Sequence, residues 1–248
     1  MFVHSALRIL AILIAYHASL SVALGFTGGA ETSITAHPYV VSLQTANGTH
    51  ICGGALIKKK IVVTTAQCFV FYDPKQIFVR VGNNNYDSDG ELIPIDAYRI
   101  NENFDFTTMD SDVAVVKLSK SVKNSRLTRE IKIAGFFGPI MWTSRSALLT
   151  GWGESKQLED VHVRIIDYKK CRSGSYVYTA TDITEKMVCA EAVNKSVCGG
   201  ESGSPLVLKG KLIGLLSWGY GCGNQGNPAV YTNVHKLRKW IKNAVKKL

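Results

Sequence analysis

The stretch Cys198-Gly199-Gly200-Glu201-Ser202-Gly203-Ser204-Pro205-Leu206 decides how the rest of the chain is interpreted. Glycines lie on both sides of its central serine, Ser202. Only a backbone without side-chain bulk lets several main-chain N–H groups crowd around one hydroxyl. The stretch therefore predicts a nucleophilic serine on a tight loop.

A second stretch, Val62-Val63-Thr64-Thr65-Ala66-Gln67-Cys68, has the apolar character of a buried strand and ends at a cysteine. A general base for the serine is expected one residue before that cysteine, where the chain carries Gln67. A carboxamide can hydrogen-bond a serine hydroxyl, but near pH 7 it has no basic lone pair to accept the proton. The two stretches together predict a fold built for catalysis that lacks its base.

The beginning of the chain has the order of a secretory signal peptide. Arg8 precedes the apolar run 9–16, and Ala23-Leu24-Gly25 offers small residues for cleavage, so residues 1–25 are expected to be removed and the protein secreted. The apolar run is too short to cross a bilayer, so no transmembrane segment is expected. The full chain has 248 residues, 46% of them apolar, and is long enough to bury a large core.

All six cysteines follow the signal segment, and an even number in an exported chain suggests three disulfides, although spacing alone leaves their pairing open. The chain has no C-x-x-C pair, which argues against structural zinc, and no metal or cofactor is expected. Asn47 and Asn194 begin glycosylation sequons.

Positive charge is in excess, with 29 Lys and Arg against 19 Asp and Glu, a net charge of +10. The excess favours acidic partners, such as anionic glycans, membrane surfaces or acidic proteins, and does not select one of them. Basic residues gather in Lys58-Lys59-Lys60 and along the C-terminal segment opposite its apolar positions. Nucleic acid is not expected, because the exported chain contains no recognition motif for it.

Short, β-branched segments separated by turn residues recur along the chain and indicate an all-β sandwich or barrel pair. The expected strands include 38–44, 61–65, 77–81, 112–118, 146–150, 161–166, 206–208 and 211–217. Only the end has helical spacing, with apolar residues at Val234, Leu237, Ile241, Val245 and Leu248, and with Asn233 able to cap it.

With these residues in place, the sequence resembles the chymotrypsin-like (trypsin-type, S1) serine proteases over essentially the whole mature chain. The motifs that carry the resemblance, in family order, are Gly28-Gly29, Pro38-Tyr39, Ser42-Leu43-Gln44, Cys52-Gly53-Gly54, Asp112-Val113-Ala114, Gly151-Trp152-Gly153, Gly200 to Pro205, Ser217-Trp218-Gly219 and Val230-Tyr231-Thr232. The resemblance implies two antiparallel six-stranded β-barrels, at 26–130 and 131–233, and a C-terminal helix at 234–248.

The resemblance also implies the disulfides Cys52–Cys68, Cys171–Cys189 and Cys198–Cys222 and the roles of the site residues. The family has histidine at the position of Gln67, an orienting aspartate at Asp112 and the nucleophile at Ser202. The oxyanion loop is implied at Gly200, Glu201 and Ser202, and the specificity pocket at Ser196, Ser217, Trp218, Gly219 and Ala229. Trypsins carry aspartate at the position of Ser196, and the methyl group of Ala229 is expected to narrow the pocket.

Gln67 leads to the expectation that the chain is no enzyme but a pseudoprotease. Loss of the histidine from the related triad of subtilisin lowers kcat by about 10⁶. The chain is accordingly expected to be a secreted, catalytically inactive homologue that acts as a binding module.

Three features also resemble the scabies mite inactivated protease paralogues. The catalytic histidine is replaced, signal peptidase alone is expected to produce the mature N-terminus, and three disulfides are expected. That resemblance implies a protein partner among host complement or other defence proteins. The alternatives are a weak or substrate-assisted serine hydrolase that uses Ser202, and a binder of anionic glycans or membrane surfaces.

Overall fold

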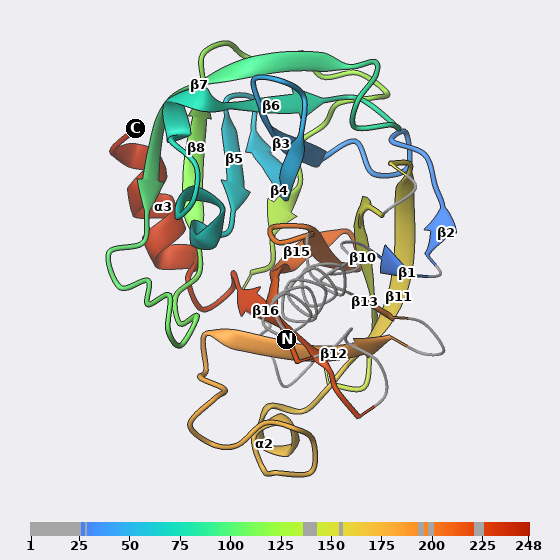
Figure 1. Cartoon of the computed structure of the whole chain (residues 1–248), viewed down its shortest axis with the longest axis vertical. Coiled ribbons are helices and arrows are strands. Elements are labelled where there is room, and N and C mark those ends of the chain that lie inside the picture. The colour runs from blue at the N-terminus through green and yellow to red at the C-terminus, as the bar shows by residue number, and fades with distance from the viewer. Residues whose placement is uncertain are drawn as a thin grey trace, which may run out of the picture.

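The computed structural model describes residues 26–27, 29–135, 143–153, 156–192, 196–197, 201–220 and 226–248. Strands dominate it, and the chain ends in a helix (Figure 1). The predicted signal peptide at 1–25 and the expected disulfide Cys198–Cys222 lie outside the described residues. The boundaries 26–130, 131–233 and 234–248 stay predictions.

The first barrel is a closed sheet of six strands in the order β3-β4-β5-β8-β7-β6. Their bounds are β3 Val40–Thr45, β4 His50–Lys58, β5 Ile61–Thr64, β6 Ile77–Val81, β7 Glu91–Ile100 and β8 Ala114–Leu118. In β6 buried residues alternate with half-exposed ones, because successive side chains of a strand point to opposite faces. The inward side chains, among them Leu43, Val62, Val79 and Ile93, form one apolar core.

The second barrel follows the order β10-β14-β15-β16-β12-β11, and pairing of β10 with β11 closes it. Its strands are β10 Ser146–Trp152, β11 Leu158–Ile165, β12 Met187–Ala192, β14 Pro205–Leu208, β15 Lys211–Trp218 and β16 Ala229–Asn233. The short strands β2 Ala30–Glu31 and β9 Lys132–Ile133 pair with β11 and β15 at its margins, and β1 Phe26–Thr27 pairs with β13 Ser196–Val197. The predicted pair of antiparallel six-stranded barrels is confirmed.

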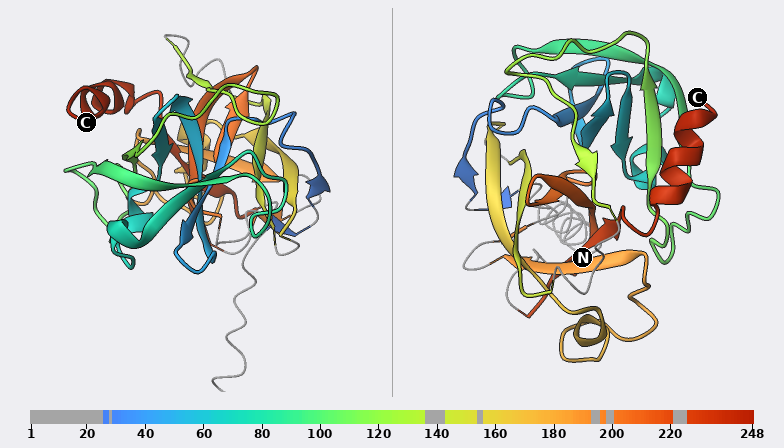
Figure 2. Two further views of the ribbon diagram at one scale, coloured as in Figure 1. Left: turned by 90° about the horizontal axis from the view of Figure 1, so that it is seen from above. Right: turned by 180° about the vertical axis from the view of Figure 1, so that it is seen from behind.

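Helix α3, Arg238–Lys246, is shorter than the predicted helical segment, because residues 234–237 form turns before it. Asn233 supports these turns, since its Oδ1 accepts a hydrogen bond from the backbone N–H of Lys236 at 3.2 Å. Although α3 follows the second barrel in sequence, it lies beside β8 of the first (Figure 1) and projects at one side of the molecule (Figure 2). Ile241 and Ala244 of α3 join a core shared with both barrels.

Two shorter helical segments matter for the site. The 3₁₀ helix η1, Ala66–Phe69, follows β5, and the helix α2, Tyr168–Cys171, precedes β12. A further 3₁₀ turn, η2, covers Pro74–Gln76. The predicted disulfides Cys52–Cys68 and Cys171–Cys189 are both formed and attach η1 and α2 to neighbouring strands. Within the described ranges, no helix has the length and hydropathy needed to span a bilayer.

Candidate active site

The site lies where the two barrels meet. Gln67 comes from η1 after the first-barrel strand β5, and Ser202 precedes the second-barrel strand β14. The Ser202 hydroxyl donates a hydrogen bond to Gln67 Oε1 at 3.2 Å, and Gln67 Nε2 donates to Asp112 Oδ2 at 2.7 Å. The structure thus brings the three predicted site residues together, in the order hydroxyl, carboxamide, carboxylate.

Asp112 is buried, and its carboxylate is held by donors on several sides. Oδ1 accepts from the backbone N–H of Gln67 at 2.9 Å, and Oδ2 accepts from the Ser217 hydroxyl at 2.5 Å as well as from Gln67 Nε2. Burial raises the pKa of Asp112 above its ordinary value, although these hydrogen bonds act in the opposite direction. The donors around Asp112 thus offset part of the cost of burying its charge.

Ser217 has a role that sequence reasoning missed. Besides its hydroxyl bond to Asp112, its backbone carbonyl accepts from Gln67 Nε2 at 2.8 Å and from the Ser202 hydroxyl at 3.4 Å. Both Nε2 hydrogens of Gln67 are thereby used, which turns Oε1 towards Ser202. The Ser217-Trp218-Gly219 motif indicated a pocket wall, and no feature of its spacing indicated this link to the carboxylate.

Glu201 of the predicted oxyanion loop is buried behind Ser202. Its Oε2 accepts from the backbone N–H of Trp152 at 3.0 Å and from the Ser204 hydroxyl at 3.1 Å. His50 Nε2 lies 3.5 Å from Oε1, and the His50 Nδ1 contacts the Ser42 hydroxyl at 2.7 Å. His50 thus faces the carboxylate of Glu201 and does not replace the missing base.

The backbone beside Ser202 requires the glycine that the sequence provides. Gly203 has φ +87°, and a Cβ there would lie 2.2 Å from the carbonyl oxygen of Gly53. The Gly53 N–H donates to the Ser202 carbonyl at 2.8 Å. Main-chain atoms of the two barrels therefore approach closely at this point, where only a residue without a side chain fits.

The predicted pocket residues Trp218, Gly219 and Ala229 lie together, with Ala229 buried. Tyr178, which sequence reasoning missed, packs edge-on against Trp218 with ring centroids 5.3 Å apart. Its hydroxyl donates to the Pro228 carbonyl at 2.6 Å and so ties the loop between Cys171 and Cys189 to this wall. Burial raises the pKa of the Tyr178 hydroxyl, which remains a donor at neutral pH.

The structure describes the remaining predicted site and glycosylation residues only in part. Gly200 and the sequon residue Asn194 lie outside the described residues, and for Ser196 the structure describes the backbone, which pairs with Thr27. Asn47 is exposed at the turn between β3 and β4, where its Oδ1 accepts from the Thr49 hydroxyl at 3.1 Å. Glycosylation of both asparagines stays a prediction.

Comparison with known proteins supports the resemblance along most of the chain. The profile of the family described as Trypsin matches residues 26–241. Trypsin theta of Drosophila melanogaster is 41% identical over 226 residues, covering 88% of this chain and 85% of the relative. A trypsin of Sarcophaga bullata is 40% identical and covers 89% of each chain, and hypodermin-B of Hypoderma lineatum is 38% identical over 86% and 85%.

These relatives contradict the expectation that the chain is no enzyme. Relatives about 40% identical over most of the chain are named as trypsins, which points to an enzyme. The expectation gave too much weight to Gln67 alone. A triad that lacks one member can retain about 10³–10⁴-fold catalysis over water through its oxyanion hole and substrate binding. The names of the relatives support neither an inactive class nor a mite origin.

Proposed function

Because this chain belongs to the trypsin family of serine proteases, we propose that it is a secreted serine hydrolase in which Ser202 is the nucleophile and the substrate supplies the base. The observation that carries the proposal is the 3.2 Å hydrogen bond from the Ser202 hydroxyl to Gln67 Oε1. The hydroxyl is held at the junction of the barrels by an acceptor that cannot take its proton.

The proposed reaction starts when a basic side chain of the bound substrate, an imidazole, reaches the Ser202 hydroxyl. Ser202 Oγ attacks the scissile carbonyl carbon while its proton passes to the imidazole, and the same imidazole then protonates the leaving amine. Water subsequently hydrolyses the acyl-enzyme and restores the hydroxyl. Gln67 and Asp112 orient the nucleophile in this scheme, and neither takes up a proton.

Two features of the pocket bear on the substrate. Ala229 adds a methyl group to the wall, and Ser196 carries no charge, so the proposed substrate has a small uncharged residue before the scissile bond. The relatives that are named trypsins belong to the same family as this chain. The preference for a small uncharged residue is proposed for this chain alone.

Paired peptides test the proposal. Both peptides of each pair keep a small uncharged residue before the scissile bond; one carries histidine immediately before that small residue, and the other carries glutamine there. We expect cleavage about 100-fold faster for the histidine peptide, since a positioned base contributes at least that factor. The Ser202→Ala variant should cleave neither peptide. Equal rates for the two peptides, or cleavage that survives Ser202→Ala, would overturn the proposal.

A second candidate function, retention of a protein ligand, is favoured by an exposed aromatic pair on the first barrel. Phe71 is 75% exposed and Phe106 is 47% exposed, and their rings pack edge-on with centroids 5.7 Å apart. Phe71 lies in the loop after Gln67, and Phe106 lies in the loop before Asp112. Large exposed aromatic side chains are typical of protein contact sites.

This second proposal includes the defence proteins, complement among them, that the sequence resemblance implies as partners. Its test is the affinity for a protein inhibitor of trypsins that occupies the cleft. The double variant Phe71→Ala/Phe106→Ala should bind it about tenfold more weakly. Leu127→Ala, which removes another exposed apolar side chain, is the matched control. Unchanged affinity of the double variant would refute the contact.

A further inference from the structure

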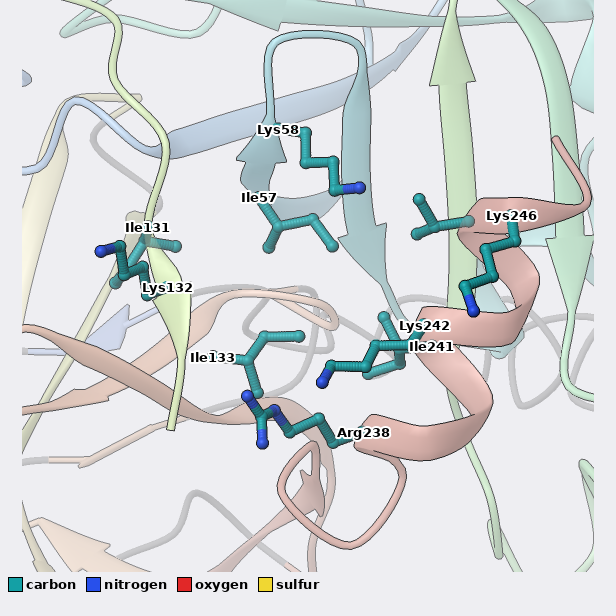
Figure 3. A pocket seen from close by; sticks show the side chains of 10 residues that line it. Ile57, Lys58, Ile131, Lys132, Ile133, Arg238, Ile241, Lys242 and Lys246 are labelled. Carbon is teal, nitrogen blue, oxygen red and sulfur yellow. The ribbon is translucent and has the colours of Figure 1, made fainter. Parts of the chain in front are cut away.

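A groove of about 540 Å³ lies beside the C-terminal helix. Three segments distant in sequence form it: the end of β4, residues 131–133 with β9, and the helix α3. Figure 3 shows their side chains arranged around one central space. Its volume falls in the range that small-molecule ligands occupy in proteins.

The groove has an apolar floor, to which all three segments contribute: Ile57 at the end of β4, Ile131 and Ile133 around β9, and Ile241 and Val245 of α3. Ile131 and Ile241 are buried, and the other three are half-buried. These side chains belong to the apolar cluster that joins the helix to both barrels. A ligand on this floor would therefore contact a continuous apolar surface, whose burial favours binding.

The rim of the groove carries five cationic side chains, from Lys58, Lys132, Arg238, Lys242 and Lys246, and no acidic residue lines it. Other lysines of the protein are neutralised by carboxylates, as in the pairs Lys120–Glu91 and Lys186–Asp110. For the five rim residues, the described part of the chain contains no ion-pair partner within 4.0 Å. The positive charge at the rim is therefore available to an anion.

We propose that this basic groove binds a long-chain carboxylate, a fatty-acid anion, with its alkyl chain on the isoleucine floor and its carboxylate among the rim cations. Each part of the ligand matches one part of the groove: an apolar chain needs the floor, and the anionic head needs unpaired cations. A sulfated glycan would leave the floor unused. A membrane surface would not enter a recess of this size, because lipid headgroups remain in the plane of the bilayer.

The inference goes beyond the proposed hydrolase function and does not depend on it, because no groove residue takes part in the Ser202 site. Its test is calorimetric titration of the full mature protein with monomeric decanoate, dodecanoate and tetradecanoate below their aggregation concentrations. Affinity should rise about fourfold per added CH₂ group, the factor expected for burial of a methylene. Dodecyltrimethylammonium, with the same chain length as dodecanoate and a positive head, should not bind.

Variants locate the site. Lys58→Gln/Lys242→Gln should weaken dodecanoate binding about fivefold, and Ile133→Glu, which places an anion on the floor, should weaken it at least tenfold. Lys239→Gln, on the exposed side of the same helix, is the matched control and should bind normally. Circular dichroism verifies that each variant folds. Equal binding of the cationic amphiphile, unchanged affinity in both groove variants, or binding to phosphatidylserine vesicles without binding of monomers would overturn the proposal.

Discussion

Replacement of Gln67 by histidine should convert the site into one with its own general base. In the structure Gln67 Nε2 donates to Asp112 Oδ2 at 2.7 Å, and Gln67 Oε1 accepts from Ser202 at 3.2 Å. An imidazole has a donor and an acceptor on opposite sides of its ring, so Nδ1–H can take over the bond to Asp112 while Nε2 faces Ser202. The same two neighbours would then hold a group that can accept the proton.

The size of the effect follows from how much of the site is already in place. Asp112 is buried and keeps the donors Ser217 Oγ at 2.5 Å and the Gln67 backbone N–H at 2.9 Å, neither of which depends on the Gln67 side chain. Such a carboxylate can orient an imidazole and stabilise its charged form. The variant should therefore gain the full effect of a positioned base, about 10²–10⁴ in rate, or roughly 3–5 kcal/mol of transition-state stabilisation.

The assay is the rate at which a fluorophosphonate probe labels Ser202, measured from pH 5 to pH 9 for wild type, Gln67→His and Gln67→Ala. The Gln67→His rate should rise with pH through a midpoint near the ordinary histidine pKa of about 6.5, because only the neutral imidazole accepts a proton. Wild type should show no such step. Ser202→Ala is the labelling blank. Equal rates for Gln67→His and Gln67→Ala would refute the reasoning, because the imidazole would then contribute nothing.

The remaining predictions concern stability, measured by urea unfolding. Burial acts to raise the pKa of Asp160, but hydrogen bonds, led by that to His37 at 2.8 Å, outweigh it and lower the pKa below its ordinary value. Asp160→Asn should lose about 1–3 kcal/mol at pH 7, and its difference from wild type should shrink as the pH falls through the folded-state pKa; a constant difference would refute the assignment. Gly203→Ala should lose at least about 2 kcal/mol, because its Cβ would meet backbone at 2.2 Å; unchanged stability would show that the loop moves freely. Cys171→Ala/Cys189→Ala should lose about 3 kcal/mol, since the disulfide closes a loop of 18 residues; a loss below about 1 kcal/mol would contradict this account.

Much of the fold could be predicted from local patterns. Alternation along strands such as Ile77–Val81 and the glycines beside Ser202 reflect constraints that act within a few residues, so they are visible in the sequence. The predicted helix was too long because its apolar spacing continues through residues 234–237, where the chain instead forms turns. Periodicity indicates which side chains are buried, and it does not separate a helix from the turns that precede it.

The sequence alone determined the barrel pair and two of the disulfides, because short β-branched segments and family motifs are properties of the chain itself. Only the tertiary structure decided how the site is connected: Ser217 lies 105 residues from Asp112 in sequence yet donates to its carboxylate, and Tyr178 reaches Pro228 over 50 residues. The basic groove likewise needs Lys58 at the end of β4 and Lys242 of α3 to line one recess. Contacts of this kind depend on how strands close into barrels, which no local pattern encodes.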